Sequence, residues 1–266
     1  MTSNTEDEMT LATRPTATDR IRSICMGASA AAMILVPTLG PVIAGTEEGA
    51  EDFDTEITPP GYAFTIWAPI FAGVAANTIQ HAARPATEIN RRTGWWLTAA
   101  YSANIVWSLA AQSDRFRYTP LILPIAAGFA LIGHRRAQSV ELHGTDRIVS
   151  HISGLLFGWT SVASVVNAFA IGHRGRGSTT KRTSRKLARY ALAGAAAGIS
   201  AIIGTSRHGH TSIAAASGWA MATNAANPER TKHTRVINAA CAALVLGACG
   251  VRRVISKTRK NRGQSP

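Results

Sequence analysis

Cysteine is scarce in this chain, and the placement of its few cysteines excludes several classes of protein. Cys25, Cys241 and Cys249 all fall in apolar stretches, and none of them belongs to a Cys-x-x-Cys pair. A disulfide framework or a zinc site needs clustered cysteines. We therefore interpret all three as small buried hydrophobic side chains, and we expect no metal site.

Charged residues are nearly absent from several long stretches. Windows of roughly 17–25 apolar or small residues are long enough to cross a bilayer. Five such windows are followed by three weaker ones that are rich in Ala, Gly, Ser and Thr: 23–44, 60–81, 95–113, 118–134, 148–172, 190–205, 211–226 and 236–251. The sequence therefore predicts an all-α, polytopic membrane helix bundle with about eight spans.

The net charge of +13 invites a nucleic-acid interpretation, but the positions of the basic residues argue against it. They lie in short connectors between the apolar windows and in the tail "RRVISKTRKNRGQ". A nucleic-acid-binding protein would carry them on a folded face, interleaved with aromatic or base-reading side chains. Basic residues beside apolar spans are instead the usual topology signal of a membrane protein. We expect no nucleic-acid partner.

The chain divides into four segments by composition. We expect a disordered tail at 1–20, a five-helix membrane domain at 21–172, additional membrane helices at 173–254 and a basic tail at 255–266. The first apolar window could also be a cleaved signal peptide. About twenty residues precede it and it is longer than a usual signal core, so we favour a retained span.

The connectors predict an orientation for the front half. With a cytoplasmic N-terminus, nine basic residues of the first 172 positions lie inside and two lie outside, while the acidic connector "GTEEGAEDFDTE" faces outward. This agrees with the positive-inside rule. The connector at 173–189 breaks the pattern, because it holds seven basic residues and would also lie outside. The orientation of the rear half is therefore left open.

Aromatic residues are concentrated in the stretch "TPPGYAFTIWAPIF". Thr58 is a good N-cap and a proline follows it, so we expect a helix to start there, at the outer interface. Phe64, Trp67 and Phe71 would then share one helical face. An aromatic belt at the membrane surface accounts for Tyr62, but it explains Trp67 less well, about two turns further into the helix.

Two other spans pair asparagine with tryptophan. Asn104 and Trp107 lie one turn apart in the third window, and Trp159 and Asn167 lie on one face of the fifth. A carboxamide in lipid is costly unless it meets a partner or a cavity. Interhelical hydrogen bonding and ligand contact are both open for the asparagines. For the three tryptophans we favour a shared pocket.

These motifs carry a resemblance to a known family. The order "TPPGYAFTIW", "NIVWSLAA" and "FGWTSVASVVNAFA" resembles the TspO/MBR family, the tryptophan-rich sensory or translocator proteins. An extended bacterial subgroup with extra C-terminal spans is more similar still. The residues that match the third-helix and fifth-helix motifs of the family are Asn104, Trp107, Ser108, Trp159, Ser161, Ala163 and Asn167. The resemblance covers roughly residues 22–172 and implies a five-helix bundle with a ligand pocket between the helices.

The resemblance also implies a function. Family members bind porphyrins and other tetrapyrroles, and some bind sterols. We therefore expect a receptor or sensor that binds a flat hydrophobic ligand, with no cofactor required and a tetrapyrrole as the candidate ligand. The expected ligand-binding residues are Tyr62, Phe64, Trp67, Asn104, Trp107, Trp159 and Asn167. The chain departs from the family at Tyr62, where Trp is commoner, and in its acidic first connector.

Other functions remain as alternatives. A small-molecule transporter would use the same cavity, and a membrane scaffold would need no ligand. An enzyme acting on porphyrin is disfavoured, because no acid–base or nucleophile constellation occurs and no catalytic residue is proposed. We expect a multi-pass protein of the bacterial cytoplasmic membrane. Its expected partners are the lipid bilayer and a hydrophobic small molecule, with homodimer formation left open.

Overall fold

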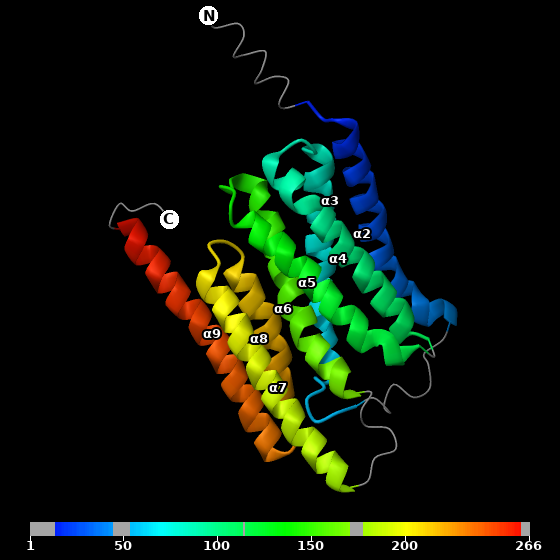
Figure 1. Cartoon of the computed structure of the whole chain (residues 1–266), viewed down its shortest axis with the longest axis vertical. Helices are drawn as coiled ribbons and strands as arrows, with labels where there is room; N and C mark the ends of the chain where they lie inside the picture. Colours follow the sequence, from blue (N-terminus) through cyan, green and yellow to red (C-terminus); the bar gives the residue numbers. More distant parts are fainter. Residues whose placement is uncertain (1–13, 45–53, 114, 171–177, 262–266) are drawn as a thin grey trace, which may run out of the picture.

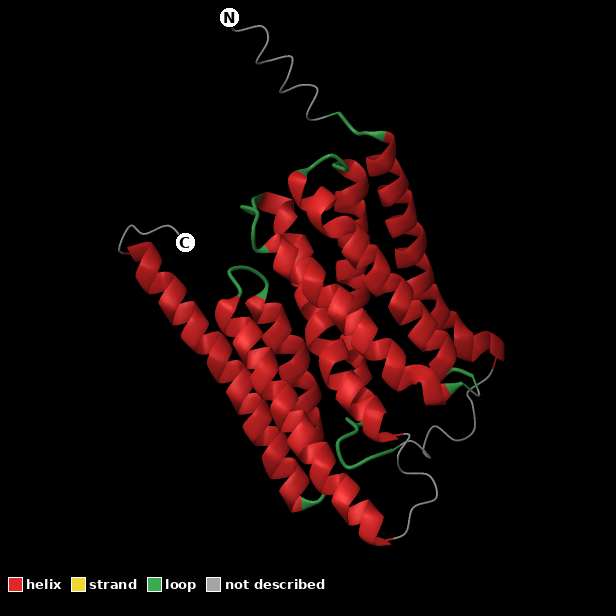
Figure 2. Cartoon of the chain, viewed as in Figure 1, coloured by secondary structure: helices red, strands yellow, loops and turns green. Residues whose placement is uncertain are grey.

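The computed structural model describes residues 14–44, 54–113, 115–170 and 178–261. Within these residues the chain forms eight α-helices, three short 3-10 turns and no strand, as Figures 1 and 2 show. This confirms the prediction of an all-α helix bundle. The predicted N-terminal tail lies mostly outside the described residues, and the helical part of the chain starts at Ala17, inside the segment that was expected to be disordered.

The front half forms a closed ring of five helices. Each helix packs on its two neighbours in the order α2–α3–α6–α5–α4 and back to α2. The ring consists of α2 (Ala17–Ala44), α3 (Trp67–Ala83), α4 (Glu88–Ala111), α5 (Thr119–Ala137) and α6 (Arg147–Ala170). Side chains that point into the ring meet there, so residues far apart in the sequence share one interior.

The rear half is a three-helix unit that packs on one side of the ring. It consists of α7 (Ser178–Thr205), α8 (His210–Ala226) and α9 (Lys232–Asn261). In Figure 1 this unit lies to the left of the ring, with α6 beside it. The helix α9 continues to Asn261, so the first residues of the predicted basic tail are helical.

Two glycines bring α6 and α8 into close contact. A Cβ atom on Gly154 would lie 2.7 Å from the carbonyl oxygen of Gly209, and one on Gly158 would lie 2.6 Å from that of Ile213. These distances leave no room for any side chain, so both positions require glycine. The similar pair on α7, Gly194 and Gly198, has nothing within 4 Å of the added Cβ atom. Only the first pair therefore acts as the small-residue contact that membrane helices use.

The start of α3 differs from the expected one. The chain is extended at Pro60 (φ −64°, ψ 158°), a 3-10 turn called η2 spans Gly61–Ile66, and the α-helix begins only at Trp67. Thr58 does not cap this helix, because its hydroxyl group accepts a hydrogen bond from the backbone N–H of Thr55 at 2.9 Å. Two consecutive prolines explain the delay: neither can donate a backbone hydrogen bond, and the residue before a proline avoids the helical region.

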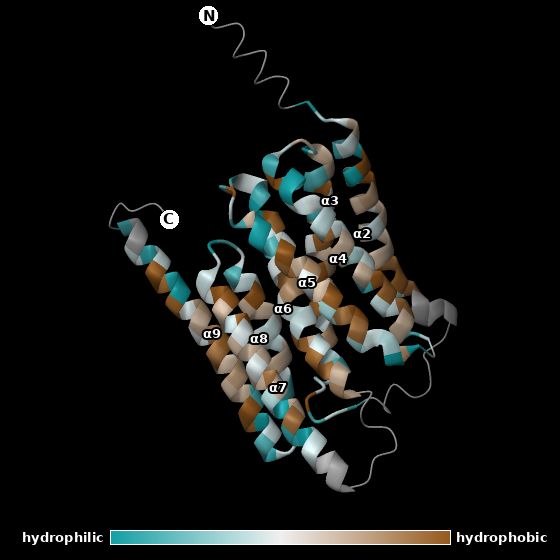
Figure 3. Ribbon diagram, viewed as in Figure 1, coloured by the Kyte–Doolittle hydropathy of each residue, from teal (hydrophilic) through white to brown (hydrophobic). Residues whose placement is uncertain are grey.

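Six of the eight helices are long and apolar enough to cross a membrane. Apolar residues dominate the middle of the helices and hydrophilic residues gather near their ends, as Figure 3 shows. The other two are α4, whose first turns carry Glu88, Arg91 and Arg92, and α8, which has 17 residues. Both pack between spanning helices, α4 between α2 and α5 and α8 between α6 and α9. The protein is therefore a multi-pass membrane protein.

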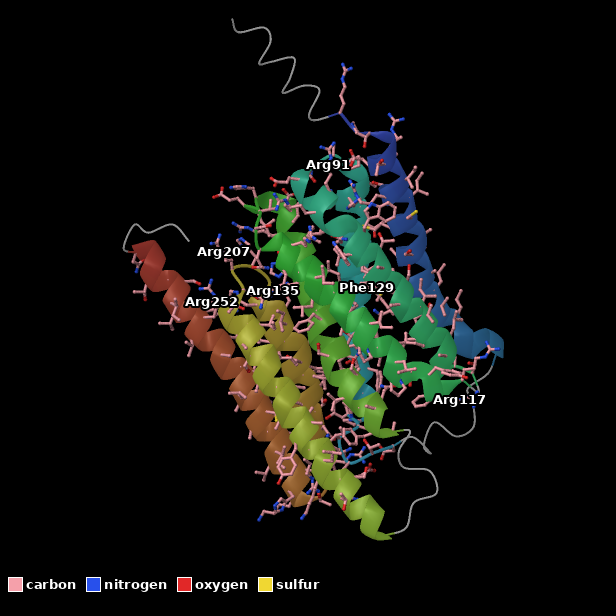
Figure 4. The ribbon with its side chains drawn as sticks, in the orientation of Figure 1. Arg91, Arg117, Phe129, Arg135, Arg207 and Arg252 are labelled. Carbon is pink, nitrogen blue, oxygen red and sulfur yellow. The ribbon has the colours of Figure 1, made fainter. Side chains whose placement is uncertain are left out.

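The two ends of the bundle carry different charges. We call upper the end at which α2, α4, α6 and α8 begin, and lower the end at which α3, α5, α7 and α9 begin. Figure 4 shows Arg91, Arg135, Arg207 and Arg252 at the upper end and Arg117 at the lower end. The acidic segment that precedes η2 lies at the lower end, as does the start of α7.

A buried ion pair marks the upper end of the ring. The carboxylate of Asp19 lies 2.7 Å from Nη2 of Arg22 and 2.8 Å from Nη2 of Arg91. Arg22 also donates from Nε to Nε2 of His81 at 3.1 Å. The first span was expected to start at residue 23, after these charges. The helix instead includes them, because Asp19 and Arg22 pair with each other and with Arg91 and His81 on neighbouring helices.

Candidate aromatic ligand site

Four aromatic rings from three helices of the ring form one cluster in its lower half. Trp67 at the start of α3 is the centre: it stacks on Phe71 at 5.4 Å and on Trp107 of α4 at 6.1 Å between ring centroids. The ring of Trp159 on α6 meets Trp67 edge-on at 6.3 Å. We call Trp67, Phe71, Trp107 and Trp159 the aromatic cluster. Parallel and perpendicular ring pairs at these distances are the favoured aromatic geometries.

The turn η2 adds a fifth ring to this cluster. Phe64 packs edge-on against Trp159 with ring centroids 5.6 Å apart, and its side chain is exposed on its other side. Phe64 lies in η2, three residues before Trp67. It joins the cluster through its contact with Trp159 of α6. Four of the seven expected site residues, Phe64, Trp67, Trp107 and Trp159, therefore lie in continuous ring contact.

The two predicted asparagines, Asn104 and Asn167, are buried, and in each the amide nitrogen has a hydrogen-bond partner while the oxygen has none among the described residues. Asn104 Nδ2 donates to the carbonyl oxygen of Ala100 at 2.8 Å, and Asn167 Nδ2 donates to that of Ala163 at 2.9 Å. Both bonds run one turn back along the same helix. Among the described residues, neither Asn104 Oδ1 nor Asn167 Oδ1 has a hydrogen-bond partner. The asparagines therefore do not bond to each other or join helices, which is the role that interhelical hydrogen bonding would give them.

A hydrogen-bond donor is also left over at the cluster. In the described part of the chain Trp107 Nε1 is buried without a hydrogen-bond partner. Asn104 lies one turn before Trp107 on the same face of α4, since three residues separate them. A free N–H group and a free carbonyl oxygen therefore occur side by side on this helix. Unpaired buried polar atoms are rare in proteins and call for an explanation.

Tyr62 lies apart from the four-ring cluster. Its ring meets Trp219 of α8 edge-on at 6.4 Å, and its hydroxyl group is 3.5 Å from the carbonyl oxygen of Thr223. Of the expected site residues, Tyr62 is thus the one that faces the rear unit. The resemblance placed it at the pocket mouth, and a membrane-belt interpretation placed it in the lipid interface. In the structure Tyr62 instead packs against Trp219 of α8, a contact that neither interpretation predicted.

Sequence reasoning missed the polar pair above the cluster and the contacts from the rear unit. Asn77 of α3 donates from Nδ2 to the hydroxyl oxygen of Tyr101 at 3.1 Å, with both residues fully buried. Trp219 donates from Nε1 to the carbonyl oxygen of Ala63 in η2 at 2.8 Å. An asparagine in the middle of the second span was a usable signal for the first contact. No local sequence pattern predicts the contact between Trp219 and Ala63, because 156 residues separate them.

The chemistry available at the cluster is binding chemistry. Its rings offer faces and edges for dispersion and π contacts, one indole N–H can donate and two carboxamide oxygens can accept. None of Phe64, Trp67, Phe71, Trp107 and Trp159 can exchange a proton near neutral pH. Within the described residues, no three His, Cys, Asp or Glu side chains come together in a way that could hold a metal ion.

Comparison with known proteins adds a family assignment. A family model described as TSPO-like protein matches residues 23–251, which includes the five-helix ring and nearly all of the rear unit. No curated protein and no solved structure gave a match. The match extends well beyond the residues that carry the aromatic motifs, so the three additional helices are part of the family pattern. The chain therefore belongs to the TSPO-like family.

Proposed function

We propose that this protein is a membrane receptor that binds a flat hydrophobic ligand, such as a tetrapyrrole, at the aromatic cluster. The observation that carries the proposal is the set of buried polar atoms that are unpaired among the described residues, on the helices that carry the rings: Nε1 of Trp107 and Oδ1 of Asn104 on α4, and Oδ1 of Asn167 on α6. A buried polar group without a partner costs about 1–3 kcal/mol. A ligand with one acceptor and one or two donors, held between the rings, would remove that cost.

The cluster favours binding over the alternatives. Proton-coupled transport usually relies on ionisable groups within the membrane, and none of the cluster residues or its two asparagines is ionisable. Catalysis on a porphyrin would need an acid, a base or a nucleophile, and the same residues offer none. A role as a scaffold would leave the unpaired atoms without a purpose. We propose a sensor-like role in a bacterial cytoplasmic membrane, with the arginine-rich upper end inside.

A porphyrin titration tests the proposal. The purified full-length protein in lipid nanodiscs is titrated with protoporphyrin IX, and binding is followed through the absorbance of the porphyrin. We expect saturable binding that Trp159→Ala weakens by about 1–3 kcal/mol, because burial and edge contacts are lost. Trp107→Phe keeps a ring but removes the N–H group, so it should weaken binding while leaving the thermal unfolding temperature nearly unchanged.

Trp95 provides the matched control. It lies on α4 like Trp107, but its side chain is 43% exposed on the outside of the bundle. Trp95→Ala should therefore leave the affinity unchanged. Equal losses in the Trp95, Trp107 and Trp159 variants, or no saturable binding by the wild type, would contradict a ligand site at this cluster.

A further inference from the structure

Two segments that are far apart in the sequence meet at the lower end of the bundle. The acidic segment Asp54–Thr58, just before η2, runs beside the lower ends of α6 and the rear helices (Figure 1). Arg230, in the connector between α8 and α9, binds Asp54 through two nitrogen–oxygen contacts of 2.6 and 2.7 Å. It also donates to the carbonyl oxygen of Thr58 at 3.0 Å. A two-pronged arginine–carboxylate pair of this kind fixes orientation as well as distance.

Glu56 is the second anchored residue of this segment. Its Oε2 accepts hydrogen bonds from the hydroxyl groups of Thr234 at 2.6 Å and Thr231 at 3.0 Å. Arg189 and Arg185 of α7 lie 3.7 and 4.0 Å from the carboxylate. Burial raises the pKa of Glu56, but these hydrogen bonds and positive charges lower it more, so the pKa falls below its ordinary value of 4.5. Glu56 therefore remains a carboxylate at neutral pH.

The turn η2 is anchored to α8 in the same way. The indole N–H of Trp219 donates to the carbonyl oxygen of Ala63 at 2.8 Å, and the ring of Trp219 holds the ring of Tyr62 edge-on. Ala63 is fully buried between the two halves of the molecule. The next residue in the chain is Phe64, which packs on Trp159 of the aromatic cluster. The turn η2 thus contacts the rear unit through Tyr62 and the backbone of Ala63, and it contacts the proposed ligand site through Phe64.

These contacts give the rear helices a role at the site. We propose that α7–α9 act as a positioning unit: Arg189, Arg230 and Trp219 hold the segment 54–66 in place, and so keep Phe64 against Trp159 and slow the exchange of ligand at the aromatic cluster. The three residues are positioning residues, since they act through the turn rather than on the ligand. This inference rests on the proposed ligand site, but the anchoring itself is measurable without any ligand.

A charge swap tests the anchoring directly. Asp54→Arg and Arg230→Asp each place like charges together, while the double variant restores an opposite pair in reversed order. Amide hydrogen exchange in residues 54–66 of the full-length protein in nanodiscs reports the order of the segment. We expect exchange to be about 2- to 5-fold faster in each single variant, the range that an exposed ion pair supports. The double variant should return within about 2-fold of the wild type.

The same variants are then used for ligand exchange. Dissociation of protoporphyrin IX, started by adding an excess of empty vesicles, should be about 2- to 5-fold faster in each single variant and near the wild-type rate in the double variant. Trp219→Phe keeps the ring but removes the N–H group, and it should also speed dissociation. Arg84→Gln is the control, because it breaks an arginine–aspartate ion pair with Asp146 at the opposite, upper end of the bundle.

The outcomes separate the two ideas. Faster hydrogen exchange with an unchanged dissociation rate would overturn the positioning role and leave the ligand site intact. A wild-type protein that binds no porphyrin would overturn the proposed function, and the hydrogen-exchange data would then decide on the anchoring alone. Unchanged exchange in both single variants, or equal changes in the Arg84→Gln control, would overturn the anchoring.

Discussion

Buried asparagine and tryptophan side chains set the polarity of the candidate site. Asn104 and Asn167 use their N–H groups on the helix that carries them, and their carbonyl oxygens are left free within the described part of the chain. A residue kept for packing alone would be apolar, because an unpaired oxygen lowers stability. If these oxygens bind a ligand, replacing either asparagine with an apolar residue should weaken ligand binding without lowering stability, so mutation can separate the two effects.

The first prediction uses this separation. Asn104→Leu removes the unpaired oxygen and replaces it with apolar surface, so we expect the thermal unfolding temperature to stay the same or rise. Affinity for protoporphyrin IX should fall by about 1 kcal/mol, or about 5-fold, because an acceptor is lost. Differential scanning fluorimetry and the porphyrin titration measure the two quantities. A parallel loss of stability and affinity would assign Asn104 to packing instead.

Asn77→Leu is the comparison for this prediction. Asn77 is fully buried and its Oδ1, like that of Asn104, has no partner among the described residues, but its Nδ2 donates to the hydroxyl oxygen of Tyr101 on another helix at 3.1 Å. Its replacement leaves the tyrosine hydroxyl without that donor, and it should lower stability by about 1–3 kcal/mol. The two variants introduce the same side chain on neighbouring helices of the ring, so a difference between them reflects the partner and not the leucine.

At the scale of helices, close packing of α6 and α8 joins the two halves of the chain. Gly154 and Gly158 lie against the backbone of α8, so the rear unit is fixed to the ring at one face of α6. The same helix presents Trp159 to the aromatic cluster. The helix α6 is thus shared by the aromatic cluster and the rear unit.

The second prediction concerns this helix pair. Gly158→Val places a branched side chain where a Cβ atom alone would lie 2.6 Å from a backbone oxygen. We expect a loss of about 1–3 kcal/mol in stability, the cost of overpacking, and a lower unfolding temperature in nanodiscs. Gly194→Val is the control, since open space surrounds that position. Similar unfolding temperatures for the two variants would contradict the close contact.

Local hydropathy predicts that the helices exist better than it predicts where they begin and end. Each of the eight apolar windows coincides with a helix, because hydropathy and length act over a single segment. The boundaries were less accurate: α2 includes Asp19 and Arg22, which pair with each other and with Arg91 of α4, and α3 begins only after the prolines. Four of the expected site residues, Phe64, Trp67, Trp107 and Trp159, have rings that lie in contact in the structure. The partner of Tyr62 depends on a helix packed from the other half, which no local pattern encodes.

Over the whole molecule, the acidic segment pairs with two of the seven basic residues that broke the orientation pattern, and with Arg230. Arg185, Arg189 and Arg230 belong to the rear half and lie at the lower end, where Asp54 and Glu56 pair with them. The positive charge of these three arginines is therefore partly neutralised at the lower end of the bundle.

The third prediction is an orientation test. In a Cys25→Ser background, Arg117→Cys at the lower end should react with a membrane-impermeant maleimide in intact cells. Arg207→Cys at the upper end should react only after lysis, because positive-inside charge places that end in the cytoplasm. Figure 4 shows the two arginines at opposite ends of the bundle. The reverse pattern of labelling would invert the orientation.

The fourth prediction is a pH dependence of the anchored segment. The pKa of Glu56 in the folded protein lies below its ordinary value of 4.5. Its contribution to stability is therefore fully present above pH 4.5, and it is lost as the pH falls through the lowered pKa. Hydrogen exchange in residues 54–66, corrected for the intrinsic pH effect, should stay constant from pH 7 to about 5 and rise below that range. Glu56→Gln should abolish the rise.

The contact between η2 and the rear helices has a consequence for biosynthesis. Chains are made from the N-terminus, so α2 to α6 are complete before Arg189, Trp219 and Arg230 have been synthesised. During that interval the turn that carries Phe64 has no anchor, and the carboxylates of Asp54 and Glu56 have none of the arginine partners they meet in the finished protein. The aromatic cluster is therefore translated before the helices that anchor its turn, and a chain that stops after α6 lacks those anchors.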